Sequence, residues 1–209
     1  MSSSSQKFVA IAFAVEAGFG FLAVLVGRRL GCDPMLTLGL DKPLGQLAGA
    51  CLWGAAAALP LLIALVILDR QPSVLVDFKK SLSSTVVPML EGLSIVEIAA
   101  ISVAAGLGEE LLFRGLVQSA LQGWFGEPYG WALAVAVASL AFGICHWLNT
   151  TYAVIAAGIG IYLGGLFLLV DNVAAPIVAH GLFDFVAILY LSCNSCRPPV
   201  SVEADEENS

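Results

Sequence analysis

The fold is decided by residues 94–121, which read SIVEIAAISVAAGLGEELLFRGLVQSAL. This stretch is apolar over the length of a membrane-crossing helix, yet Glu109, Glu110 and Arg114 stand in its second half. An ionisable side chain at the centre of a bilayer costs on the order of 2.5–3.5 kcal/mol, so such residues normally face the inside of a helix bundle and pair there. The stretch therefore predicts a helix that carries polar groups into a transmembrane bundle.

The composition of the whole chain agrees with a membrane environment. Of its 209 residues, 59% are apolar and only 12% are charged, whereas a soluble domain has about a quarter charged residues and under half apolar ones. The length suits about six spanning helices of roughly 20 residues each. We therefore expect an all-α, polytopic transmembrane helical bundle, a multi-pass integral protein of the cell or inner membrane with membrane lipid around it.

Six apolar runs are long enough to be expected spans. They cover residues 8–26, 47–68, 94–121, 131–147, 152–170 and 175–191. The first run is longer than the core of a signal peptide and lacks a small-residue cleavage site, so we expect a retained helix. Residues 73–92 have mixed polarity and predict either an interfacial amphipathic helix or a loop with one short helix.

The polar residues outside these runs limit the classes of partner. The net charge is −7, and acidic residues crowd positions 203–207 in a pattern typical of a solvated tail. No basic patch is present, which argues against nucleic acid, and the sequence indicates no oligomeric state. Cys193 and Cys196 form one C-x-x-C pair, for which a redox or metal role, an inert pair and a lipidation site are alternatives.

Two i, i+4 pairs place ionisable groups together on helix faces. Glu110 and Arg114 lie one turn apart, as do His180 and Asp184. Glu109 is rotated by about 100° from Glu110 and can point elsewhere. Carboxylates, imidazoles and a guanidinium from separate spans can therefore meet at one point inside the bundle.

The chain has two histidines, and both lie in or at the end of apolar runs. His146 follows Phe142 by four residues, so the fourth run also carries a polar group on one face. A buried glutamate such as Glu109 can accept a proton from water, and imidazoles can assist. Alternatively, Glu109, His146 and His180 would ligate zinc and leave one position for water. Glu16 and Glu97 match neither arrangement, and we interpret them as helix-end or interior polar contacts.

Three motifs occur in order on apolar runs and resemble those of one family. Residues 109–114 match E-E-x-x-x-R, residues 142–146 match F-x-x-x-H, and residues 180–184 match H-x-x-x-N/D. The set resembles the CAAX protease and bacteriocin-processing family of intramembrane endopeptidases, also called the Abi group. The resemblance covers roughly residues 94–192.

The resemblance implies a role for each matched residue. Glu109 would activate water with the help of His146, and His180 and Asp184 would line the oxyanion site. Three further side chains would support the site: Glu110, Arg114 and Phe142. The family implies membrane-associated peptide or protein substrates, including prenylated CAAX-type sequences. We favour a mechanism without a cofactor over the zinc-dependent alternative.

This reading divides the chain into three parts and leaves two rival functions. Residues 1–93 would hold N-terminal transmembrane helices and the mixed segment, residues 94–192 the protease core, and residues 193–209 an acidic disordered tail. Asp184 departs from the asparagine of prenyl-protein proteases, which weakens the CAAX substrate assignment more than the protease assignment. The alternatives are a proton-coupled transporter and a non-catalytic membrane scaffold or immunity protein.

Overall fold

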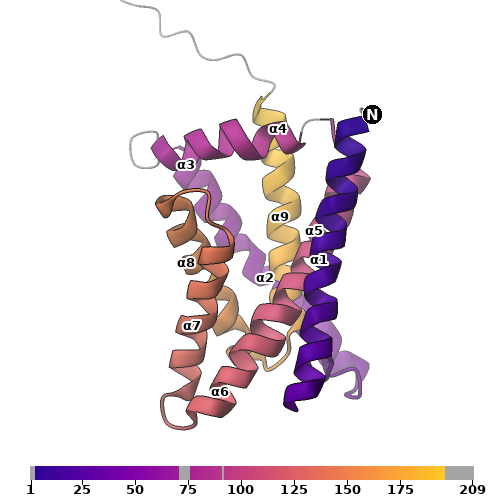
Figure 1. Ribbon diagram of the computed structural model, residues 1–209, viewed down its shortest axis with the longest axis vertical. Helices are drawn as coiled ribbons and strands as arrows, with labels where there is room; N and C mark the ends of the chain where they lie inside the picture. The colour runs from indigo at the N-terminus through magenta and orange to yellow at the C-terminus, as the bar shows by residue number, and fades with distance from the viewer. Residues whose placement is uncertain (1–2, 71–75, 91, 196–209) are drawn as a thin grey trace, which may run out of the picture.

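The computed structural model in Figure 1 is a bundle of helices and describes residues 3–70, 76–90 and 92–195. Within these ranges every regular element is helical, which confirms the all-α prediction. The elements are α1 (Ser3–Leu30), η1 (Pro34–Leu38), α2 (Leu44–Asp69), α3 (Val76–Ser81), η2 (Leu82–Val86), α4 (Val87–Leu90), α5 (Ile95–Glu110), η3 (Leu111–Gln118), α6 (Ser119–Phe125), α7 (Gly130–Cys145), α8 (Thr150–Val170) and α9 (Ala174–Ser195).

Four helices in the described part of the chain are long and apolar enough to cross a membrane. They are Lys7–Leu30 in α1, Leu44–Asp69 in α2, Thr150–Val170 in α8 and Ala174–Ser192 in α9. Helix α7, at Gly130–Cys145, is apolar but shorter. The protein is thus a multi-pass integral membrane protein, and these five helices correspond to expected runs.

The remaining expected span is helical but is interrupted. It consists of α5, η3 and α6 in direct succession, and η3 is a π-helix. The segment begins with a capping box, in which Ser94 Oγ accepts from the Glu97 backbone N–H at 3.3 Å and the Glu97 carboxylate accepts from the Ser94 N–H at 2.8 Å. Such a cap stabilises a helix by about 1 kcal/mol. The wider π turns start directly after Glu110, and π segments are frequent at functional sites.

Helix α9 lies in the middle of the bundle, between α2 and α5 (Figure 1). Glycines let both neighbours approach it closely. A Cβ added at Gly106 of α5 would lie 2.8 Å from the carbonyl oxygen of Ile177, and one at Gly54 of α2 would collide with the carbonyl of Ala175. Small residues at helix contacts are a common basis of packing in lipid, where no hydrophobic effect drives helices together. These contacts fix α9 against the helix that carries the carboxylates.

Helices α3 and α4, joined by η2, lie across one end of the bundle (Figure 1). The Asn149 side chain, which also caps α8 by accepting from the Tyr152 N–H at 2.8 Å, donates to Ser81 Oγ at 2.6 Å. The mixed segment is therefore helical over residues 76–90. Of the two alternatives for this segment, a helix across the bundle end fits better than a loop with one short helix.

Two sequence-based expectations fall outside the described residues. Cys196 and the acidic positions 203–207 are not described, and neither is the Cys193 side chain. Three cysteines that are described, Cys32, Cys51 and Cys145, are free thiols.

Candidate active site

Direct contacts connect all the side chains of the three motifs into one cluster. The cluster contains Glu109, Glu110, Arg114, Phe142, His146, His180 and Asp184. The side chains come from the end of α5, from η3, from the end of α7 and from the first half of α9. Separate helices therefore bring these residues to one place in the bundle, as their spacing in the sequence predicts.

Glu110 and Arg114 form the most deeply buried part of the cluster. Arg114 Nη1 donates to Glu110 Oε1 at 2.7 Å, and the two side chains are 1% and 0% exposed. Arg114 Nη2 donates to the carbonyl of Gly160 on α8 at 2.9 Å. Burying two charges is costly, and close pairing with extra hydrogen bonds offsets that cost. The pair therefore joins η3 to α5 and α8 at a fixed distance.

His180 lies between two carboxylates. Its Nδ1 is 2.8 Å from Glu110 Oε1, and its Nε2 is 3.3 Å from Asp184 Oδ2. A neutral imidazole has one N–H, whereas an ionised carboxylate only accepts hydrogen bonds. Both contacts are satisfied together when the ring carries two protons. His180 is thereby held in one orientation, from α5 on one side and from the next turn of α9 on the other.

Glu109 points to a different place, beside His146. Glu109 Oε2 lies 3.6 Å from His146 Nε2, which exceeds a direct hydrogen bond. His146 Nδ1 lies 2.9 Å from the carbonyl oxygen of Phe142. Because that carbonyl can only accept, the proton of the neutral ring is assigned to Nδ1, which leaves the lone pair of Nε2 facing Glu109. The two acceptors, Glu109 Oε2 and His146 Nε2, therefore face each other.

This end of the cluster is also its accessible end. The side chains of His146 and Asp184 are 29% and 28% exposed, whereas Glu109 is 8% exposed. The opposite end, at Glu110, is closed. The cluster is therefore partly exposed at His146 and Asp184, whereas Glu109 Oε2 beside them is buried and has no hydrogen-bond partner among the described residues.

Phe142 packs against residues from both halves of the cluster. Its ring stacks on His146 with centroids 4.4 Å apart and meets His180 edge-on at 5.9 Å. The Arg114 guanidinium carbon lies 4.9 Å from the centre of the ring, and Phe113 meets the ring edge-on at 5.1 Å. Aromatic and cation–π contacts of this kind are worth about 0.5–2 kcal/mol each. Phe142 thus holds the two imidazoles apart and in place.

Two polar residues near the cluster match none of the three motifs. Gln118 is fully buried, and its Nε2 donates to the carbonyl of Gly164 at 3.1 Å, one turn along α8 from the Arg114 contact. Its spacing of four residues from Arg114 is a readable signal for this position. Glu16 of α1 packs its backbone on Gly108, next to Glu109. A carboxylate inside the first apolar run is the only sequence signal for this residue.

The residues proposed for zinc do not form a metal site in this arrangement. Both nitrogens of His180 face Glu110 and Asp184, so His180 has none left to join Glu109 and His146. A catalytic zinc site needs three protein ligands around one point. Among the described residues, no group of three or more His, Cys, Asp or Glu side chains has the geometry to hold a metal ion.

Comparisons with known proteins agree with the motifs. The family model for the type II CAAX prenyl endopeptidase Rce1-like family matches residues 91–186, which include every residue of the cluster. No curated protein and no solved structure gives a significant match. The resemblance read from the three motifs is confirmed by the family match. Residues 91–186 are therefore a domain of the Rce1-like type II CAAX prenyl endopeptidase family, carried in an integral membrane protein.

Proposed function

We propose that this protein is an intramembrane endopeptidase that hydrolyses a peptide bond of a membrane-associated protein, using water activated by Glu109 and His146. The observation that carries the proposal is the pair of acceptors, Glu109 Oε2 and His146 Nε2, that lie 3.6 Å apart at the end of the cluster where His146 and Asp184 are partly exposed. A water molecule has two O–H donors, so it can donate one to each acceptor. Its oxygen lone pair is then free to attack.

In the proposed reaction, one proton moves from the attacking water to Glu109 and then to the leaving amine. The water oxygen attacks the carbonyl carbon of the substrate, and Glu109 takes the proton that the water releases. The tetrahedral intermediate collapses when the C–N bond breaks, and the proton passes to the leaving amine. His146 orients the water through Nε2, and its Nδ1 contact with the Phe142 carbonyl keeps the ring in the required tautomer.

The geometry favours a positioning role for His180. The resemblance implies that His180 and Asp184 line the oxyanion site. Both nitrogens of His180 are occupied by carboxylates, so in this arrangement the ring has no free N–H for a substrate oxygen. We therefore propose that Glu110, Arg114 and Asp184 hold His180, and that its positive charge stabilises the developing negative charge across a short distance.

The family supports a prenylated CAAX-type peptide as the first substrate to test. Peptides without a prenyl group should be tested as well, because Asp184 stands where prenyl-protein proteases have asparagine. In vesicles containing the purified protein, we expect release of a C-terminal fragment from a fluorogenic CAAX-type peptide, and faster release when the peptide is farnesylated. Glu109→Gln should lower the rate by about 10²–10⁴-fold, the usual contribution of a general base. The control is Glu127→Gln, which changes an exposed loop glutamate and should leave the rate unchanged. Full activity in the Glu109→Gln variant would reject the proposal.

A further inference from the structure

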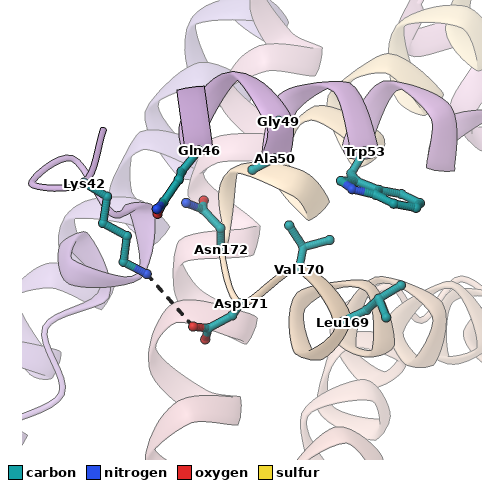
Figure 2. A pocket seen from close by; sticks show the side chains of 9 residues that line it. All are labelled: Lys42, Gln46, Gly49, Ala50, Trp53, Leu169, Val170, Asp171 and Asn172. Atoms are coloured by element: carbon teal, nitrogen blue, oxygen red, sulfur yellow. Dashed lines mark ion pairs between the residues drawn. The ribbon is translucent and has the colours of Figure 1, made fainter. Parts of the chain in front are cut away.

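A groove that is separate from the catalytic cluster runs between α2 and α8. It consists of two adjoining hollows of about 480 and 520 Å³. The first has polar walls at Lys42, Gln46 and Asp171 (Figure 2). The second is apolar, with Pro60, Ile161 and Gly165 among its lining residues. Trp53 and Leu169 line both hollows, so the two lie side by side, and together we call them the α2–α8 groove.

The groove has the depth of one leaflet of a bilayer. Its polar end lies where α2 begins, at Leu44, and where α8 ends, at Val170, which is the boundary of both spans. Along the axis of α8, the distance from Asp171 to Ile161 is about 15 Å, at about 1.5 Å per residue. This is half of the roughly 30 Å hydrocarbon thickness of a membrane. A molecule with a polar end and an apolar chain of one-leaflet length matches the groove along its whole course.

The protein itself does not fill the groove. Apart from the adjacent residues and backbone of the same helix, no heavy atom lies within 4 Å of a Cβ placed on Gly49 in the polar hollow or on Gly165 in the apolar hollow. Trp53 and Leu169 are 58% and 74% exposed. In a membrane such apolar walls are covered by hydrocarbon chains. The space is therefore open to an acyl chain.

The polar end carries one cation and one anion that are only loosely joined. Lys42 Nζ and Asp171 Oδ2 lie 4.0 Å apart, which is too far for a hydrogen bond (Figure 2). The Lys42 and Asp171 side chains are 43% and 93% exposed. The neighbouring Asn172 is uncharged and already makes two hydrogen bonds, because it donates to Leu38 O at 3.0 Å and accepts from the Ala174 N–H at 2.8 Å. Lys42 and Asp171 are thus the charges available to a ligand.

We propose that the α2–α8 groove is a binding site for phosphatidylethanolamine. Its phosphate pairs with Lys42, its ammonium group donates to Asp171, and one acyl chain lies along Trp53 and Gly165. A zwitterionic headgroup satisfies both charges, whereas an anionic headgroup without an amine meets repulsion from Asp171. A choline headgroup carries no N–H and makes a weaker contact with the carboxylate.

Trp53 provides a direct probe of this site. The chain has four tryptophans, and replacing the other three by phenylalanine (Trp124, Trp131 and Trp147) leaves Trp53 as the sole indole. In vesicles of the full chain, acyl-brominated phosphatidylethanolamine should quench Trp53 about two- to fivefold more strongly than brominated phosphatidylglycerol at equal mole fraction, the range expected for exposed ion pairs. Brominated phosphatidylcholine should quench less than phosphatidylethanolamine. Lys42→Gln and Asp171→Asn should each remove the preference.

A glycine pair supplies the matched test of the acyl-chain site. Gly165→Leu fills the apolar hollow and should reduce quenching by phosphatidylethanolamine. Gly158→Leu is the control on the same helix, because Gly158 also has no heavy atom within 4 Å of an added Cβ but does not line the groove. If the tryptophan replacements unfold the protein, native mass spectrometry of the wild-type chain and of the two leucine variants counts retained phospholipid instead. Equal quenching by all headgroups would overturn the proposal. So would an unchanged preference in the Lys42 and Asp171 variants, or a Trp53 that no lipid quenches because a second copy covers it.

Discussion

Removing the Arg114 guanidinium tests whether the buried ion pair holds the cluster together. In Arg114→Met, the fully buried Glu110 carboxylate loses the guanidinium at 2.7 Å, and His180 is left as the single cation between two carboxylates, Glu110 and Asp184. Breaking a buried pair from one side costs about 3–5 kcal/mol, because it leaves an uncompensated charge. We therefore expect a loss of about 3–5 kcal/mol in the free energy of unfolding. The assay is unfolding in mixed micelles with increasing fractions of a denaturing detergent, followed by circular dichroism.

A double variant tests whether the loss of stability comes from the unpaired charge. Glu110→Gln in the Arg114→Met background removes the stranded charge and keeps an oxygen that can accept from His180. The double variant should therefore be more stable than Arg114→Met alone, with a coupling energy of about 1–3 kcal/mol between the two sites. Arg70→Met is the control, because Arg70 is exposed at the end of α2 and should change stability by less than about 0.5 kcal/mol. Additive effects of the two substitutions would show that Glu110 and Arg114 do not stabilise the protein as a pair.

Three further predictions concern helix packing, an exposed ion pair and metal dependence. Gly108→Ala places a methyl group against the carbonyl of Glu16, so it should destabilise the protein by about 1–3 kcal/mol; Gly18→Ala, which meets open space, should not lower the melting temperature. The Arg28 guanidinium, which donates to Asp33 at 2.8 Å, holds the pKa of Asp33 below its usual value. The stabilisation that this ion pair provides is fully present above about pH 3.9, the pKa of Asp33 in the unfolded chain. It is lost as the pH falls through the lower pKa of Asp33 in the folded protein. The difference in melting temperature between wild type and Asp33→Asn should therefore become smaller below about pH 4. A difference that does not change with pH would show that the ion pair does not stabilise the protein. Because His180 is engaged by two carboxylates, a zinc chelator should leave hydrolysis unchanged, and loss of activity that added zinc restores would contradict that view.

Much of the fold can be predicted from the position of polar residues in apolar runs. The run at residues 152–170 agrees with α8 at Thr150–Val170 within two residues, because turn residues delimit it on both sides. Glu97, interpreted as a helix-end or interior contact, is a helix-end contact: it forms the capping box with Ser94, and the S-x-x-E pattern at that point is the local signal for it. The i, i+4 spacing likewise indicates the partners Glu110 and Arg114.

Other features depend on tertiary contacts and have no local signal. The π-helix at Leu111–Gln118 replaces ordinary helical hydrogen bonds within a run that reads as a continuous helix. The second contact of His180, to Glu110, joins α5 to α9 across 70 residues of sequence. No helical spacing predicts which imidazole nitrogen meets which carboxylate. That choice depends on the close approach that Gly106 permits between the two helices.

The most direct test of the central claim, that Glu109 and His146 act on one water molecule, is a double-mutant cycle on the rate of peptide hydrolysis. Rates are measured for wild type, Glu109→Gln, His146→Ala and the double variant, with folding checked by circular dichroism. Because residues that act as a unit are strongly non-additive, we expect each single change to lower the rate by about 10²-fold or more and the double variant to be hardly worse than Glu109→Gln alone. If the two losses multiply independently, or if either single variant keeps full activity, Glu109 and His146 do not act on one water molecule.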